Sequence, residues 1–211
     1  MRGADERAKV AARVSEFTGL SKAYLLESNL RVEPSRFQKE LLRSATGEGS
    51  KIIGRFDGRM TGFPTDAAGD SQEYDPSLTA FYAAYTSAFN DYVRRQLKFE
   101  SDLPYEILSG RVQPWNYSSG GAGGSNGYLY VGDDLRNAMT HNPTLRVMVC
   151  SGWYDMATPY FATEYQLEHM TLAPEVRKNI STKFYEGGHM MYHVRPSLVK
   201  LQGDVAAFVG P

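Results

Sequence analysis

The sequence lacks pairs of cysteines, long apolar runs and an excess of either charge. Cys150 is the one cysteine among 211 residues, which excludes a disulfide within the chain. No stretch approaches the roughly 20 apolar residues of a transmembrane helix, and the residues after Met1 do not form the apolar segment of a signal peptide. A formal net charge of −1 gives no electrostatic reason to expect nucleic acid or a membrane as a partner.

What is present is the composition of an ordinary globular chain. Hydrophobic residues make up 42% of it and charged residues 22%, which suits one domain, or one and a half, with a sizeable core. Residues 1–127 have the pattern of a helical, loop-rich region, and residues 128–211 that of a compact unit of alternating strands and helices. We therefore predict an α/β chain with two parts of different character.

The first part is expected to consist mainly of helices. Three short ones are indicated between residues 4 and 44, and a longer one over residues 76–97. Along the longer helix, large apolar residues recur at every third or fourth position: Leu78, Tyr82, Tyr85, Phe89 and Val93. We expect this stripe to lie in the core, because aromatic side chains bury large areas without needing a ligand. Between the helices, Ile52-Ile53 predicts a short strand, and Asp57 with Arg59 predicts an ion pair that braces a loop.

Strands and helices alternate in the last third of the chain. Residues 146–151 form an apolar, β-branched run that stops at Gly152, typical of a buried parallel strand, with Cys150 as a small core residue within it. A helix over 159–170 and a second strand over 182–185 follow. A last amphipathic helix is indicated by apolar residues three or four positions apart: Leu198, Leu201, Val205 and Phe208. Strand, helix, strand in this order predicts a right-handed crossover and a parallel pair.

Each predicted strand is followed at its carboxyl end by a side chain suited to proton transfer. Asp155 follows the first strand and His189 the second, and the carboxyl ends of parallel strands meet at one edge of a sheet. A carboxylate that holds one imidazole nitrogen leaves the other free to take a proton from a nucleophile. Simpler roles stay open at this point, since Asp155 also suits a helix N-cap and His189 a turn after two glycines.

A metal site at the same place is disfavoured. His193 stands four residues after His189, and Glu186 stands three residues before His189. This spacing suits zinc when the segment is helical. Gly187 and Gly188 predict a loop instead, and the sequence has no H-E-x-x-H motif.

A serine pattern occurs earlier in the chain. Residues 123–127, Gly-Gly-Ser-Asn-Gly, match G-x-S-x-G. That nucleophile elbow needs a buried strand entering the turn and a helix leaving it, whereas a glycine-rich tract precedes Ser125. Ser125 nevertheless stands before Asp155 and His189 in the order nucleophile, acid, base, so a small serine esterase remains an alternative function.

Two segments around the predicted pair resemble a known enzyme family. Residues 151–159 are Ser-Gly-Trp-Tyr-Asp-Met-Ala-Thr-Pro, and residues 186–192 are Glu-Gly-Gly-His-Met-Met-Tyr. They resemble the carboxyl-terminal part of the serine carboxypeptidase family of α/β-hydrolases, in its bacterial form. The similarity extends back through four further segments, at residues 28–32, 54–59, 74–77 and 89–93. The resemblance implies a partial α/β-hydrolase fold, with a cap-like region over residues 1–127 and the last parallel strands and helices of the core over residues 128–211.

The resemblance also implies roles for individual residues. Asp155 corresponds to the catalytic acid, His189 to the general base, and Met190 to a residue that lines the leaving-group pocket. The implied reaction removes the carboxyl-terminal residue of a peptide through an acyl-enzyme, without a cofactor or a metal. The family's nucleophile lies upstream in a Gly-Glu-Ser-Tyr-Gly motif that this sequence lacks. We therefore expect a fragment that is inactive by itself.

The expected partners follow from the same resemblance. A peptide is the expected substrate, and the compartment stays unknown, although proteins of this family are commonly exported. A parallel sheet truncated on one side leaves an unpaired strand edge and apolar surface. We therefore expect a homodimer or association with the missing amino-terminal half, and a non-catalytic binding or assembly module remains an alternative function.

Overall fold

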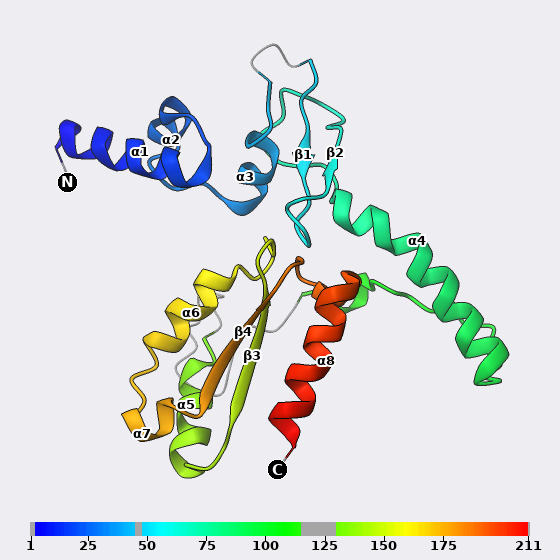
Figure 1. Cartoon of the computed structure of the whole chain (residues 1–211). Coiled ribbons are helices and arrows are strands. Elements are labelled where there is room, and N and C mark those ends of the chain that lie inside the picture. The colour runs from blue at the N-terminus through cyan, green and yellow to red at the C-terminus, as the bar shows by residue number, and fades with distance from the viewer. Residues whose placement is uncertain (1–2, 45–47, 115–129, 211) are drawn as a thin grey trace.

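The computed structural model describes residues 3–44, 48–114 and 130–210 (Figure 1). Helices predominate over a few short strands, an architecture compatible with the α/β class. In chain order the helices and strands are α1 (Ala4–Thr18), α2 (Lys22–Glu27), α3 (Pro34–Glu40), β1 (Ile52–Ile53), β2 (Thr61–Gly62), α4 (Pro76–Asp91), α5 (Gly132–His141), β3 (Val147–Gly152), α6 (Tyr160–Glu168), α7 (Pro174–Arg177), β4 (Ile180–Tyr185) and α8 (Arg195–Val209). The boundary predicted after residue 127 falls outside the described residues.

Strands β3 and β4 form the parallel pair that the sequence predicted. Val147 pairs with Ile180 at one end of the ladder and Gly152 with Tyr185 at the other. Helices α6 and α7 lie in the connection between the two strands, and α8 follows β4 (Figure 1). The carboxyl ends of both strands therefore point to the same edge of the sheet.

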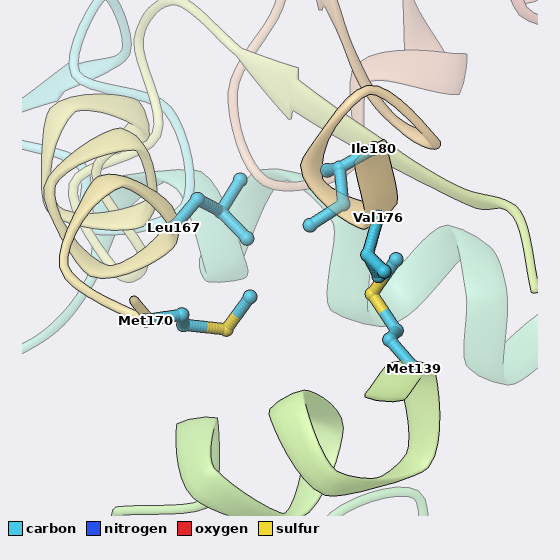
Figure 2. Packing of buried hydrophobic residues seen from close by; sticks show 5 residues of the cluster. All are labelled: Met139, Leu167, Met170, Val176 and Ile180. Carbon is cyan, nitrogen blue, oxygen red and sulfur yellow. The ribbon is translucent and has the colours of Figure 1, made fainter. Parts of the chain in front are cut away.

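Helices cover both faces of this sheet. On one face, a buried cluster joins α5, α6 and α7 to the first residue of β4 (Figure 2): Met139, Leu167, Met170, Val176 and Ile180. Val147 and Val149 of β3 pack against the same cluster, as alternate residues of one strand face do. On the opposite face, the Tyr185 hydroxyl donates a hydrogen bond of 2.9 Å to Asp204 of α8.

The first part of the chain has a smaller core of its own. Helices α1 and α2 pack around Ala11, Leu20 and Leu25, with residues of α3 alongside. Ser21 caps α2, because its hydroxyl accepts a hydrogen bond of 3.1 Å from the Tyr24 amide. The predicted short strand at residues 52–53 is confirmed, as β1, and it pairs antiparallel with β2.

Helix α4 departs from its predicted environment. The helix itself is confirmed and continues into a π-helical turn, Tyr92–Gln96. It projects away from the rest of the molecule (Figure 1), and its aromatic stripe is not core: Tyr82 is 43% exposed, Tyr85 47% and Phe89 37%. The prediction was wrong because periodicity shows that one face is apolar but not that anything packs on it.

Two further observations concern the burial of Cys150 and the length of the helices. Cys150 is half-buried rather than fully buried, and among the described residues β3 pairs with β4 alone. Within the described ranges, no helix is both long and apolar enough to cross a membrane.

Candidate active site

Asp155 and His189 meet at the carboxyl edge of the β3–β4 pair. The Asp155 Oδ2 and His189 Nδ1 atoms are 2.9 Å apart, so the predicted contact between them is confirmed. The Asp155 side chain is buried, and 40% of the His189 side chain is exposed to solvent. A buried acid therefore holds an imidazole that solvent and a ligand can reach.

The Asp155 carboxylate has further donors. Oδ1 accepts hydrogen bonds from the backbone amides of Ala157 (2.8 Å) and Thr158 (2.9 Å), and Oδ2 accepts one from the Thr158 hydroxyl (2.7 Å). Asp155 thus stabilises the turn before α6 as well as holding the histidine, although the residue directly before that helix is Pro159. Of the two roles that the sequence left open for Asp155, the partner of a histidine is confirmed, whereas the helix N-cap is wrong because Pro159 occupies that position.

These hydrogen bonds determine the ionisation of Asp155. Burial by itself opposes the charged form, but the hydrogen bonds from Thr158, His189 and Ala157 outweigh it, and the pKa of Asp155 lies below its ordinary value. The carboxyl group is therefore an anion at neutral pH. An anion accepts the Nδ1 proton of His189, which fixes the tautomer with Nε2 unprotonated.

Nε2 of His189 is available for chemistry. It makes no hydrogen bond to any residue of the described ranges, and the ring lies over Phe56 with the two ring centroids 5.3 Å apart. The His189 backbone amide donates to the Phe56 carbonyl at 2.6 Å. Phe56 therefore contacts both the backbone and the ring of His189, and Nε2 keeps no hydrogen-bond partner among the described residues.

A loop from the first part of the chain provides this support. The Gly58 amide donates to the Tyr154 carbonyl at 2.9 Å, and the Met156 amide donates to the Arg55 carbonyl at 3.1 Å. The loop over residues 54–60 is therefore hydrogen-bonded to the segments that follow both strands, which we call the strand exits: residues 153–156 after β3 and residues 186–189 after β4. The sequence did not predict this contact, because no local pattern indicates which distant loop reaches a strand end.

Two glycines permit the close approach of these backbones. A Cβ atom on Gly188 would lie 1.9 Å from the Phe56 carbonyl oxygen, and one on Gly152 would lie 2.1 Å from the Gly188 carbonyl oxygen. Contacts this short are impossible for any other residue without movement of the backbone. Gly152 and Gly188 thus explain why the strand exits and the loop over residues 54–60 can pack so tightly.

The predicted ion pair of Asp57 and Arg59 is confirmed and lies in this loop. The Arg59 Nε and Nη2 atoms donate to the two oxygens of the buried Asp57 carboxylate at 3.0 and 2.7 Å. The Arg59 guanidinium also lies over the Tyr154 ring, 4.4 Å from its centroid. The hydrogen bond to Asp57 raises the pKa of Arg59 further. The pair braces the loop against one strand exit.

Met190 lies beside the histidine and lines a small cavity. The cavity has a volume of about 180 Å³, and its wall is mainly apolar with three polar side chains, those of Asp57, Arg59 and His193; the other lining residues are Phe56, Met60, Phe81, Gly188, Met190 and Val194. This position suits the substrate-binding role expected of Met190, and that role stays a prediction.

His193 does not join His189 at a metal site. Its Nε2 atom is hydrogen-bonded to the hydroxyl of Tyr85 in α4, and its ring packs on Phe81 with the centroids 4.1 Å apart. Burial lowers the pKa of His193 below its ordinary value. Among the described residues, no group of three metal-ligating side chains converges. Ser125 lies outside the described residues.

Comparisons with protein-family models, with curated proteins and with solved structures find no match. The arrangement supplies an ionised carboxylate and a partly exposed histidine in the tautomer of a general base, with no hydrogen bond from Nε2 to the described residues. In the described part of the chain, no hydroxyl or thiol lies within hydrogen-bond distance of that nitrogen.

Proposed function

We propose that Asp155 and His189 are the acid and base of a serine-type carboxypeptidase, in an α/β-hydrolase fold of which this chain forms the cap-like region and the last strands. The observation that carries the proposal is the hydrogen bond of 2.9 Å from Nδ1 of His189 to the buried Asp155 carboxylate, at adjacent parallel strand ends. The two motifs that resemble the family contain these same residues.

The roles follow from the orientation of the imidazole. Nε2 of His189 would take the proton of a serine hydroxyl as that oxygen attacks the carbonyl carbon of the terminal peptide bond, and would then give the proton to the leaving amine. Asp155 would stabilise the imidazolium formed between these steps. Met190, with the cavity beside it, would contact the leaving residue. No cofactor or metal is needed.

The nucleophile is the part of the proposal that this sequence does not supply. It holds no Gly-Glu-Ser-Tyr-Gly motif, and a base without a nucleophile cannot form an acyl-enzyme. We therefore expect the 211-residue chain to release no carboxyl-terminal amino acid from a blocked dipeptide, as followed by mass spectrometry. A polypeptide that also includes coding sequence upstream of Met1, with such a motif, is expected to release it and to lose this activity in the His189→Ala variant.

A second assay tests the base in the chain itself. An activated ester such as p-nitrophenyl acetate reacts with an accessible imidazole without any serine. We expect His189→Ala to remove most of the slow hydrolysis, Asp155→Asn to lower it, and the matched surface variant His141→Ala to leave it unchanged. Equal effects of His189→Ala and His141→Ala would count against a special role for His189.

The esterase alternative has its own test. A fluorophosphonate probe that labels Ser125, with labelling lost in His189→Ala, would replace the carboxypeptidase proposal by a small serine esterase. Absence of labelling on the chain would end that alternative.

A further inference from the structure

The hydroxyl group of Thr158 lies beside both members of the candidate acid–base pair. Its Oγ1 atom is 2.7 Å from Oδ2 of Asp155 and 3.2 Å from Nδ1 of His189, and Oδ2 and Nδ1 are themselves 2.9 Å apart. The three atoms form a triangle in which every side is a hydrogen-bond distance. The sequence resemblance implies roles for Asp155 and His189, and none for Thr158.

The protons of this triangle are determined by the ionised carboxylate. Asp155 is an anion and contributes no proton, and the Thr158 hydroxyl donates its own proton to Oδ2. Nδ1 of His189 is then within reach of two oxygen atoms that can only accept from it. An unprotonated Nδ1 would face the lone pairs of both oxygens, whereas a protonated one satisfies them. Thr158 and Asp155 therefore favour the same tautomer, in which Nε2 is the free base.

The backbone around Thr158 supports this contact. Pro159 follows it, and a proline disfavours helical dihedral angles at the residue before it. The β-branched side chain of threonine also restricts rotation about χ1. The Thr158 amide donates to Oδ1 of Asp155 at 2.9 Å. Thr158 thus binds both oxygens of the carboxylate, which holds Oδ2 toward His189.

We propose that Thr158 is a positioning residue for the general base, because its hydroxyl orients Oδ2 of Asp155 and is a second acceptor for the Nδ1 proton of His189. The inference rests on the proposed function, since it concerns the base of that reaction. The hydroxyl contacts Nδ1 and not Nε2, so Thr158 acts through its two neighbours rather than on the reacting groups.

Three variants separate this role from a purely structural one. Thr158→Val keeps nearly the same shape and removes the hydroxyl, whereas Thr158→Ser keeps the hydroxyl. Thr158 is exposed, so neither replacement leaves a buried cavity. Thr163→Val is the matched control, because it makes the same replacement within α6, where the hydroxyl has no hydrogen bond to the described residues.

An NMR titration of the Asp155 side-chain carboxyl carbon measures the first effect. The hydroxyl stabilises the charged form of that group. We therefore expect the pKa of Asp155 to rise in Thr158→Val and to keep its parent value in Thr163→Val, with Thr158→Ser close to the parent chain. A hydroxyl that only stabilised the turn before α6 would change the free energy of unfolding and leave this pKa unchanged.

The slow hydrolysis of p-nitrophenyl acetate measures the second effect. We expect Thr158→Val to lower the rate that depends on His189 by about threefold to tenfold, as the loss of one hydrogen bond implies. Thr158→Ser should restore most of this rate. The effects of Thr158→Val and Asp155→Asn should not add in the double variant, because the hydroxyl acts largely through that carboxylate.

The outcomes distinguish this inference from the proposed function. An unchanged pKa of Asp155 in Thr158→Val, or an unchanged rate in that variant beside a clear loss in His189→Ala, would overturn the role of Thr158 and leave the proposed function intact. Equal rates for the parent chain and His189→Ala would count against the proposed function instead. The pKa of Asp155 would then still show whether the Thr158 hydroxyl holds the carboxylate.

Discussion

The β3–β4 unit and helix α4 are both rich in apolar residues, yet they bury them to different extents. Around β3 and β4, side chains from α5, α6 and α7 close a cluster in which Met139 is fully buried (Figure 2). On α4, an apolar stripe of similar regularity stays open to solvent, and Tyr85 contacts the rest of the molecule through His193. A periodic apolar stripe thus specifies a helix, while its burial depends on the elements around it.

The largest expected effect is on the free energy of unfolding, and it differs between the β3–β4 unit and α4. Met139→Ala removes a fully buried side chain and leaves a cavity, so we expect the free energy of unfolding to fall by about 2–5 kcal/mol. Tyr82→Ala on α4 should change it by less than about 1 kcal/mol, since this side chain is 43% exposed. Urea denaturation of both variants makes the comparison. Equal losses would show that α4 is packed in solution.

The next effect concerns the contact between the two parts of the chain. Gly188→Ala places a Cβ atom against the Phe56 carbonyl oxygen, so the loop over residues 54–60 must move, at a cost of about 1–3 kcal/mol. Gly203→Ala is the matched control, because it lies within α8 with nothing within 4 Å of the added atom, and it should stabilise the protein by about 0.5–1 kcal/mol. A Gly188→Ala variant as stable as the control would contradict the observed packing.

The contribution of Asp155 to the stability of the fold is expected to depend on pH. The pKa of Asp155 is lower in the folded chain than the value of about 3.9 in an unfolded one. Its ionised form therefore stabilises the fold above pH 4, and this contribution is lost as the pH falls through the lower, folded pKa. Asp155→Asn should cost about 1–3 kcal/mol at pH 7, with a smaller difference from the parent chain below pH 4. Urea denaturation at a series of pH values would detect this, and a difference that grows in acid would contradict it.

The smallest effect concerns the attachment of α4. Tyr85→Phe removes the hydroxyl that is hydrogen-bonded to Nε2 of His193 and should cost at most about 1 kcal/mol. Tyr82→Phe changes a neighbouring tyrosine on the same helix and should have no measurable effect. Hydrogen exchange of the α4 amides would show faster opening in Tyr85→Phe alone. Identical exchange in both variants would exclude the hydrogen bond as an attachment.

Much of the carboxyl-terminal part was predictable because its signals are local. The apolar run before Gly152 and the strand ending at Tyr185 indicate two parallel strands, and parallel strands bring their carboxyl ends to one edge. The contact of Asp155 with His189 follows from that topology. What the sequence left open was whether Asp155 caps the next helix or holds the histidine; it holds the histidine, and its other hydrogen bonds go to the turn before α6 rather than to an N-cap position.

The sequence by itself determined the order of strands and helices, the parallel pairing, and the edge at which Asp155 and His189 meet. Only the tertiary structure decided that the loop over residues 54–60 contacts the segments that follow both strands, and that the α4 stripe is exposed. The physical reason is that hydrophobic period and turn chemistry act over a few residues. Which distant segment fills the space beside an element depends instead on how the whole chain packs.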